Sequence, residues 1–286
     1  MNIKSSIFAF ACLLLACSMV LGQCFDQEFH FVPKFGSWYA APFVGNGLDV
    51  SGDWMIVGHP GFSKPKLGFY HGKVDFFKKQ SDGHWKLVQS EISPFGFDSC
   101  EFFGGSVALD GGTAAVGSTL GFTSRVDIYH LNGDEQWVYQ QSLEEPPIPD
   151  FVGGFGAPID IHGDTMAIGN TTINIFDDPG GIVHIYKRQG GVWGAEQELT
   201  DGSVDSFGTG IKLTNDRILI SNGNPLPKVD GEDVSLLFER NKIGQWIEVG
   251  QFAGGNASHS SSICGDTVAV STNEDSSTVS ASRSAC

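Results

Sequence analysis

Apolar and polar residues alternate in short segments of this chain, and each segment ends at a pair of turn residues. Leu48 and Val50 alternate with polar neighbours before the first pair, and similar segments precede the others: Gly52-Asp53, Gly111-Gly112, Gly163-Asp164, Asn215-Asp216 and Gly265-Asp266. A period of two residues is that of a β-strand. The segment after each turn, such as 54–57, is apolar at nearly every position, which indicates a strand covered on both faces.

The turn residues are of the types that accept the positive φ of a two-residue hairpin. We therefore interpret the recurring aspartate as a turn residue. A second hairpin follows each first one, with strands expected at 73–77, 125–129, 182–186 and 234–238. The partner strands begin at four tryptophans, which repeat at about 52-residue intervals: Trp85, Trp137, Trp193 and Trp246.

Four strands per unit, little helical periodicity and 38 glycines predict an all-β fold. An array of such units is typical of a β-propeller built from four-stranded antiparallel blades.

Phe-Gly pairs begin three of the units, at Phe103-Gly104, Phe155-Gly156 and Phe207-Gly208. Val-Gly ends the second strand at Val57-Gly58 and Val116-Gly117. Over roughly residues 43 to 272, these motifs resemble the FG-GAP repeats of integrin-α-type propellers. The resemblance implies an adhesion-like scaffold that binds an extracellular protein or a glycan. Integrin-type units often carry an Asp-x-Asp-x-Asp-Gly calcium loop, but no unit here has that spacing, so we expect no metal and no cofactor.

The two ends of the chain resemble complementary halves of one more unit. Residues 28–32 followed by Trp38 look like a second hairpin, and residues 261–271 look like a first hairpin. Their pairing would give five blades with a composite closing blade. Because propellers of the resembled family usually have seven blades, the alternative is an incomplete part of a seven-bladed propeller.

Residues 1–22 have the pattern of a signal peptide, which leaves 23–286 as the propeller. Lys4 provides a basic start, residues 7–15 an apolar core, and Val20 and Gly22 small residues before a cleavage site. The apolar segment is too short for a stable membrane span. We expect a secreted protein.

Secretion makes two covalent features relevant. Asn170 and Asn256 begin glycosylation sequons that the repeat places in loops. Four cysteines remain after cleavage and are disulfide candidates with three pairings open: Cys24, Cys100, Cys264 and Cys286. A bond between Cys24 and Cys286 would clasp the ring.

A net charge of −16 argues against nucleic acid or anionic lipid as a partner, and we expect a monomer. Motifs of the GxSxG, HExxH, P-loop and GxGxxG types are absent from the sequence. The eight histidines show no spacing that would indicate a metal site.

One set of equivalent positions on the first strands would surround the axis of a ring: Asp49, Ala108, Asp160, Lys212 and Ser262. In five-bladed propeller hydrolases, carboxylates on the innermost strands act as acid and base on sugars. Asp49 and Asp160 are therefore the catalytic candidates, although a third carboxylate is lacking. The sequence leaves two functions open, a binding scaffold and a secreted carbohydrate-active hydrolase.

Overall fold

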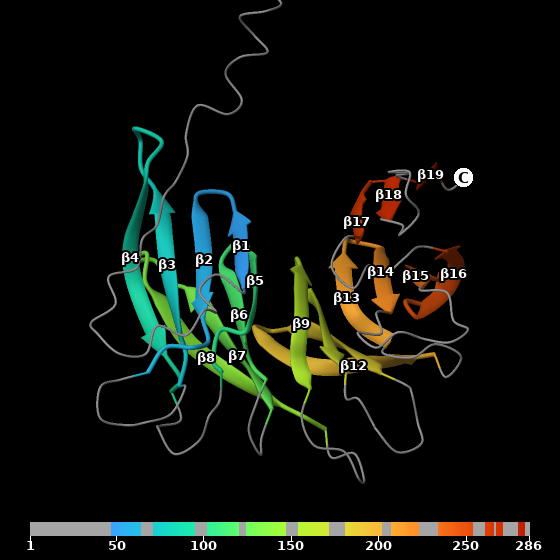
Figure 1. Cartoon of the computed structure of the whole chain (residues 1–286), viewed down its shortest axis with the longest axis horizontal. Helices are drawn as coiled ribbons and strands as arrows, with labels where there is room; N and C mark the ends of the chain where they lie inside the picture. The colour runs from blue at the N-terminus through green and yellow to red at the C-terminus, as the bar shows by residue number, and fades with distance from the viewer. Residues whose placement is uncertain are drawn as a thin grey trace, which may run out of the picture.

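The computed structural model of the chain describes residues 47–63, 71–94, 102–119, 124–146, 154–171, 181–201, 207–222, 234–253, 261–265, 267–270 and 280–283. The regular structure of these residues is entirely β-strand, arranged in five antiparallel sheets (Figure 1). This confirms the predicted all-β class and its repeated antiparallel units.

The sheets are numbered as blades 1 to 5 in chain order. Blade 1 contains β1 (Leu48–Ser51), β2 (Trp54–His59), β3 (Lys73–Lys79) and β4 (Trp85–Ile92). Blade 2 contains β5 (Ser106–Asp110), β6 (Thr113–Ser118), β7 (Arg125–Leu131) and β8 (Trp137–Glu144). Blade 3 contains β9 (Phe155–His162), β10 (Thr165–Asn170), β11 (Ile182–Gln189) and β12 (Val192–Thr200). Blade 4 contains β13 (Phe207–Leu213), β14 (Arg217–Asn222), β15 (Val234–Arg240) and β16 (Trp246–Ala253).

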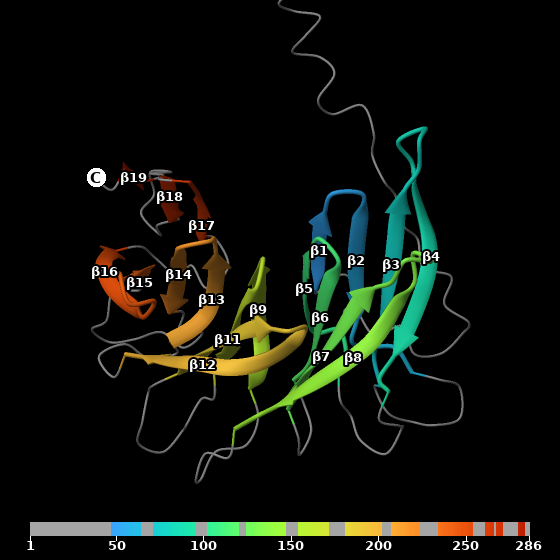
Figure 2. The ribbon, with the colours of Figure 1, turned by 180° about the vertical axis from the view of Figure 1, so that it is seen from behind.

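Blade 5 has three strands, β17 (Ser261–Cys264), β18 (Thr267–Val270) and β19 (Ser280–Arg283). The first strands β1, β5, β9, β13 and β17 pack on one another in sequence order, which is the arrangement of the inner strands of a β-propeller. In both views of the molecule β17 lies apart from β1 (Figures 1 and 2). The described sheets alone therefore leave the ring open between blades 5 and 1.

The third strand of blade 5 differs from the composite blade that the sequence predicted. The outer edge of β18 pairs with β19, through Val268 with Ser282 and Ala269 with Ala281. A segment from the C-terminal end of the chain thus fills the place expected for residues 28–32. Residues 28–32 and Trp38 lie outside the residues that the structure describes.

Four of the five predicted turns have the expected glycine at positive φ. The φ values are +59° at Gly52, +54° at Gly111, +59° at Gly163 and +54° at Gly265. The fourth turn also has the two predicted central residues, Asn215 and Asp216, because the N–H of Thr214 donates to the carbonyl of Arg217 at 2.8 Å, but Asn215 is not at positive φ. The hydroxyl of Thr214 closes this turn by accepting the backbone N–H of Arg217 at 3.1 Å.

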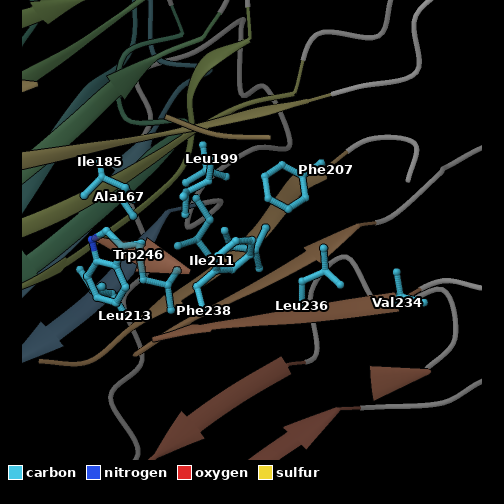
Figure 3. Packing of buried hydrophobic residues seen from close by; sticks show 13 residues of the cluster. Ala167, Ile185, Leu199, Phe207, Ile211, Leu213, Val234, Leu236, Phe238 and Trp246 are labelled. Carbon is cyan, nitrogen blue, oxygen red and sulfur yellow. The ribbon is translucent and has the colours of Figure 1, made fainter. Parts of the chain in front are cut away.

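Four of the five apolar core clusters of the described residues lie between two consecutive blades, and the fifth lies within blade 1. The second strands β2, β6 and β10 are buried at every residue, as their continuous apolar character predicted. Figure 3 shows the cluster between blades 3 and 4, where Ile185 and Leu199 lie near Ile211 and Trp246. Burying one such side chain contributes about 1.5–3 kcal/mol, so the blade interfaces hold most of the stabilising apolar area.

A close backbone contact fixes the distance between blades at three interfaces. In each case a glycine of the second strand faces the carbonyl oxygen of the Phe-Gly glycine in the next blade. A Cβ atom added to the second-strand glycine would lie far too close to that oxygen: 1.9 Å for Gly58 and Gly104, 2.3 Å for Gly117 and Gly156, and 2.6 Å for Gly169 and Gly208. The Phe-Gly glycines adopt φ values of +88°, +96° and +89°, which other residues rarely adopt. The Phe-Gly glycine and the second-strand glycine, which follows a valine at two interfaces and Ile168 at the third, are therefore the two sides of one contact.

A glutamine side chain joins the outer strands at the same three interfaces. Its amide donates to the carbonyl of the next blade's tryptophan and accepts that residue's N–H: Gln89 with Trp137 (2.6 and 2.9 Å), Gln141 with Trp193 (2.8 and 3.1 Å), and Gln197 with Trp246 (2.9 and 2.9 Å). A β-bulge immediately before each glutamine changes the direction of its side chain. We call this arrangement the glutamine clasp. Blade 4 has the bulge but carries Gly250 at the equivalent position.

We predict that Gly117→Ala destabilises the protein by about 3 kcal/mol, because the new methyl group would overlap the carbonyl oxygen of Gly156. Urea denaturation measures the free energy of unfolding. Gly133→Ala in the same blade is the control, since a Cβ there meets nothing within 4 Å. Equal stability of the two variants would contradict the role assigned to this contact.

Candidate functional site

The two ends of the sheets differ in how the strands are connected. Because neighbouring strands are antiparallel, the short hairpin turns leave one end, which we call the turn end. The connections 60–72, 93–105, 119–124, 145–154, 171–181, 201–206, 223–233 and 254–260 leave the opposite end, which we call the loop end. Much of their length lies outside the described residues, but the positions at which they leave the sheets are described (Figure 1).

A buried ionic group stands at the loop end of blade 1. The fully buried carboxylate of Asp75 accepts hydrogen bonds from Lys73 Nζ at 2.8 and 3.0 Å and from Ser90 Oγ at 2.5 Å. His59 Nε2 lies 2.9 Å from Asp75 Oδ2. Burial alone would raise the pKa of Asp75, but its bonds with His59, Lys73 and Ser90 prevail and lower that pKa to about 2. The group joins both ends of connection 60–72.

Blade 2 repeats this arrangement with different residues. The buried carboxylate of Asp127 accepts from Arg125 Nε at 3.2 and 3.3 Å and from the hydroxyl of Ser142. Arg125 also donates to Ser93 Oγ at 2.7 Å. Because Ser93 follows β4 and Arg125 begins β7, this network ties connection 93–105 to the neighbouring blade.

The equivalent position in blade 3 is His184, whose Nδ1 lies 3.3 Å from Glu198 Oε1. Burial lowers the pKa of His184, although the charge of Glu198 opposes this. In blade 4, the side chain of Asn222 accepts the N–H of Val234 at 2.5 Å and so joins the two ends of connection 223–233. The starts and ends of several long connections are thus held by buried polar contacts.

The axial candidates Asp49 and Asp160 act as ties between inner strands. Asp49 accepts the N–H of Val50 at 2.8 Å with one oxygen and that of Leu109, on β5, at 2.7 Å with the other. Asp160 repeats this with Ile161 at 3.0 Å and Leu213, on β13, at 2.7 Å. Each carboxylate therefore joins its own inner strand to that of the next blade.

Electrostatic interactions relate these two carboxylates to Lys212. Burial raises the pKa of Asp160 to about 6, although the Lys212 ammonium and the Leu213 N–H lower it, and the charge of Asp49 raises it further. Burial also raises the pKa of Asp49, against the N–H groups of Leu109 and Val50 and the charge of Lys212. Three of the five predicted axial positions thus influence one another. Ala108 is buried and contributes no charge, and Ser262 on β17 is exposed.

A pocket of about 560 Å³ lies at the turn end between blades 2 and 3, lined by His130, Gln140, Asp164, Arg188, Gly190 and Gly191. The two side chains of opposite charge that line it, Asp164 and Arg188, form an ion pair. Arg188 Nε contacts Asp164 at 2.7 Å, another guanidinium nitrogen donates to Thr113 at 2.7 Å, and Gln140 donates to the carbonyl of Gly191. These contacts pair the charges of Asp164 and Arg188 and engage the side chain of Gln140.

The candidates for covalent modification are only partly within the described residues. Asn170 was expected in a loop, but it is the last residue of β10, is 2% exposed, and donates to Glu145 Oε1 at 2.9 Å. Cys264 ends β17 and is exposed, with no disulfide partner in the described part of the chain. Asn256, Cys24, Cys100 and Cys286 lie outside the described residues.

The buried ionic groups at the loop end and the glutamine clasp were not predicted from the sequence. A basic residue two positions before an aspartate, in Lys73-Val-Asp75 and Arg125-Val-Asp127, is the signal for the first. A glutamine four positions after a tryptophan, in three of the units, is the signal for the second.

Within the residues that the structure covers, no three histidine, cysteine or carboxylate side chains are grouped as metal ligands would be. The described part of the chain also contains no helix long and apolar enough to cross a membrane.

No protein-family model and no curated protein matches the chain. Among solved structures, a periplasmic gluconolactonase of Pseudomonas aeruginosa aligns at 11% identity and a TM-score of 0.44, covering 81% of this chain and 82% of its own. A neuraminidase-like protein from A/bat/Guatemala aligns at 13% identity and a TM-score of 0.40, covering 76% of this chain and 59% of its own. With TM-scores this low, the likenesses carry no argument, and the architecture is established by the sheets themselves.

We predict that Asp75→Asn lowers the free energy of unfolding at pH 7 by about 3 kcal/mol, since Lys73 would lose its buried carboxylate. The pKa of Asp75 is lowered in the folded protein, so its contribution is present above about pH 4 and is lost as the pH falls towards about 2. Urea denaturation at several pH values should show the difference from wild type shrinking over that interval. Asp53→Asn in an exposed turn is the control, and a pH-independent difference for Asp75→Asn would refute this account.

A second prediction concerns Asp160, whose pKa is raised to about 6. Its stabilising contribution is full below about pH 4 and is lost as the pH rises through about 6. Carboxyl ¹³C NMR titration should show this pKa rising further in Lys212→Met and falling in Asp49→Asn. Lys242→Met in a turn-end hairpin should leave it unchanged. If neither axial substitution moves the pKa, the three side chains do not share an electrostatic environment.

Proposed function

We propose that this protein is a secreted or cell-surface propeller of the FG-GAP type that binds an extracellular protein or a glycan through its loop end. The observation that carries the proposal is the difference between the two ends of the sheets. All long connections leave one end, and buried polar groups hold several of them where they join the strands. Connections presented by a rigid scaffold are where binding residues are most often found.

Assignment to the FG-GAP type is supported by the role of its defining motif. In the three units with Phe-Gly, the phenylalanine is fully buried and the glycine makes the close contact with the preceding blade: Phe103, Phe155 and Phe207. The motif spaces the blades at three of the four interfaces between consecutive described blades. The Phe-Gly motif determines how the blades pack, whereas the connections at the loop end would determine which ligand binds.

The axial carboxylates favour a scaffold over an enzyme. Both oxygens of Asp49 and both oxygens of Asp160 accept backbone N–H groups of the inner strands. A catalytic pair must instead direct one carboxyl group at the leaving group and the other at the sugar carbon or at water. These hydrogen bonds, which join the inner strands of neighbouring blades, account for both residues without a catalytic role.

One observation favours the second candidate, a carbohydrate-active hydrolase. A carboxyl group with a pKa near 6 is suited to donate a proton to a leaving group near neutral pH, and burial places Asp160 in that range. In that mechanism Asp160 would be the acid and Asp49 the second carboxylate. Hydrolysis of fluorogenic glycosides that is abolished by Asp160→Asn, with the fold retained, would establish this function.

The extracellular location is part of the same proposal. Cleavage after a signal peptide of residues 1–22 would give a chain that begins near Gln23, which mass spectrometry of the culture medium can detect. The same spectra would report glycans at Asn170 or Asn256 and any disulfide among the four candidate cysteines. A glycan at Asn170 would require its amide to leave the contact with Glu145.

The binding function is tested with the purified secreted protein on a glycan array and on intact cells of the source organism. Replacing 172–180 or 224–232 by a glycine-serine linker of equal length should reduce binding at least about tenfold, because these segments leave the loop end. Ile243→Ser, in a turn-end hairpin where the side chain is 79% exposed, is the matched control and should bind normally.

The result decides between the two ends of the molecule. Normal binding by both linker variants together with loss in Ile243→Ser would place the ligand at the turn end. Absence of binding to every array glycan and to the cells would reject the scaffold proposal.

A further inference from the structure

One face of blade 1 carries exposed apolar side chains at positions that are buried in the other blades. Leu48 and Val50 on β1 are 59% and 47% exposed. Their equivalents in blades 2, 3 and 4 are only 4 to 8% exposed: Val107, Leu109, Ile159, Ile161, Ile211 and Leu213. Those six residues are buried in the core clusters that join each blade to the preceding one. In the described residues, β1 has no such covering blade.

The apolar face continues across the rest of the blade. Val57 pairs with Leu48, and Met55 pairs with Val50, so all four side chains lie on one face of the sheet. Met55 and Val57 cluster with Phe77 and Trp85 on the same side. An apolar face of this extent, left in water at β1, favours a covering element, since each Å² removed from water contributes roughly 25 cal/mol.

Blade 5 is a poor cover for this face. The residues of blade 5 equivalent to Trp54 and Ile56, which pack against blade 2, are Thr267 and Ala269. Thr267 is exposed and Ala269 is small, and both Ser262 and Cys264 on β17 are exposed. Moreover, β17 lies apart from β1 in Figures 1 and 2.

The segment that precedes β1 in the chain has the composition of a cover. Residues 23–43 contain seven aromatic side chains: Phe25, Phe29, Phe31, Phe35, Trp38, Tyr39 and Phe43. Phe29 and Phe31 alternate like Val74 and Phe76, the β3 residues that cover blade 2. The fifteen residues 33–47 can span up to roughly 50 Å when extended, which allows residues 28–32 to reach any part of blade 1.

We propose that residues 28–32 of the same chain cover the open face of blade 1, with Phe29 and Phe31 packed on Leu48 and Val50. This contact gives blade 1 the apolar cover that blades 1 to 3 give to their successors. It does not depend on the proposed binding function, because it concerns the edge of the propeller and not the loop end.

A photo-crosslinking experiment tests the contact directly in the full-length chain. Phe31 is replaced by p-benzoylphenylalanine, the purified protein is irradiated, and the crosslinked peptides are identified by mass spectrometry. We expect crosslinks to residues 48–57 within a monomer. The same probe at Tyr139, which is 40% exposed on β8, is the control and should not reach those residues. Crosslinks between two chains, crosslinks to blade 5, or none would each overturn the proposal.

Thermal unfolding provides a second measurement that needs no crosslink. If residues 28–32 cover β1, Val50→Ala should lower Tm by roughly 3 to 6 °C, as at a buried site. Val192→Ala is the matched control, because Val192 is 60% exposed on β12. Phe31→Ser should remove most of the effect of Val50→Ala when the two are combined. Equal Tm values for Val50→Ala and Val192→Ala would show that the face of β1 stays in water.

Discussion

The spacing between blades is fixed by the contact of a second-strand glycine with the carbonyl of the next blade's Phe-Gly glycine. At Gly58, Gly117 and Gly169 a single methyl group would already overlap that oxygen. At this spacing, buried side chains such as Phe76 and Ile168 fill the volume between two sheets. It also brings Gln89, Gln141 and Gln197 within hydrogen-bond distance of the neighbouring blade. One backbone contact thus governs both the core and the outer strands.

In this scaffold, carboxylates stabilise the contacts between strands, including two carboxylates that the sequence suggested as catalytic. Asp49 and Asp160 tie inner strands together, and Asp75 and Asp127 hold the ends of connections. Buried carboxylates are stable there because each accepts several hydrogen bonds. A change in a connection at the loop end leaves these blade contacts intact.

The repeat made the strands, the two-residue turns and the propeller architecture predictable, because alternation and turn glycines are local signals. The fourth turn shows the limit of these signals: the Asn-Asp pair lies where it was predicted, but Asn215 is not at positive φ and the hydroxyl of Thr214 closes the turn. The buried group around Asp75 was unpredictable for another reason. It joins His59, Lys73 and Ser90 from three strands, and only the register of the sheet brings them together. Asp49 and Asp160 were correctly placed on the inner strands, but their backbone partners depend on the neighbouring blade.

The blade interfaces become weaker towards the C-terminal end of the described chain. Between blades 4 and 5 the buried cluster consists of Leu219, Leu237, Val268 and Val270, without a fully buried aromatic side chain. Gly250 occupies the clasp position, so blade 4 offers its successor no glutamine. In a repeat array, stability is approximately the sum of each unit and its neighbouring interfaces. Blade 5 should therefore open at a lower free energy than blades 2 and 3, which have a complete interface on both sides.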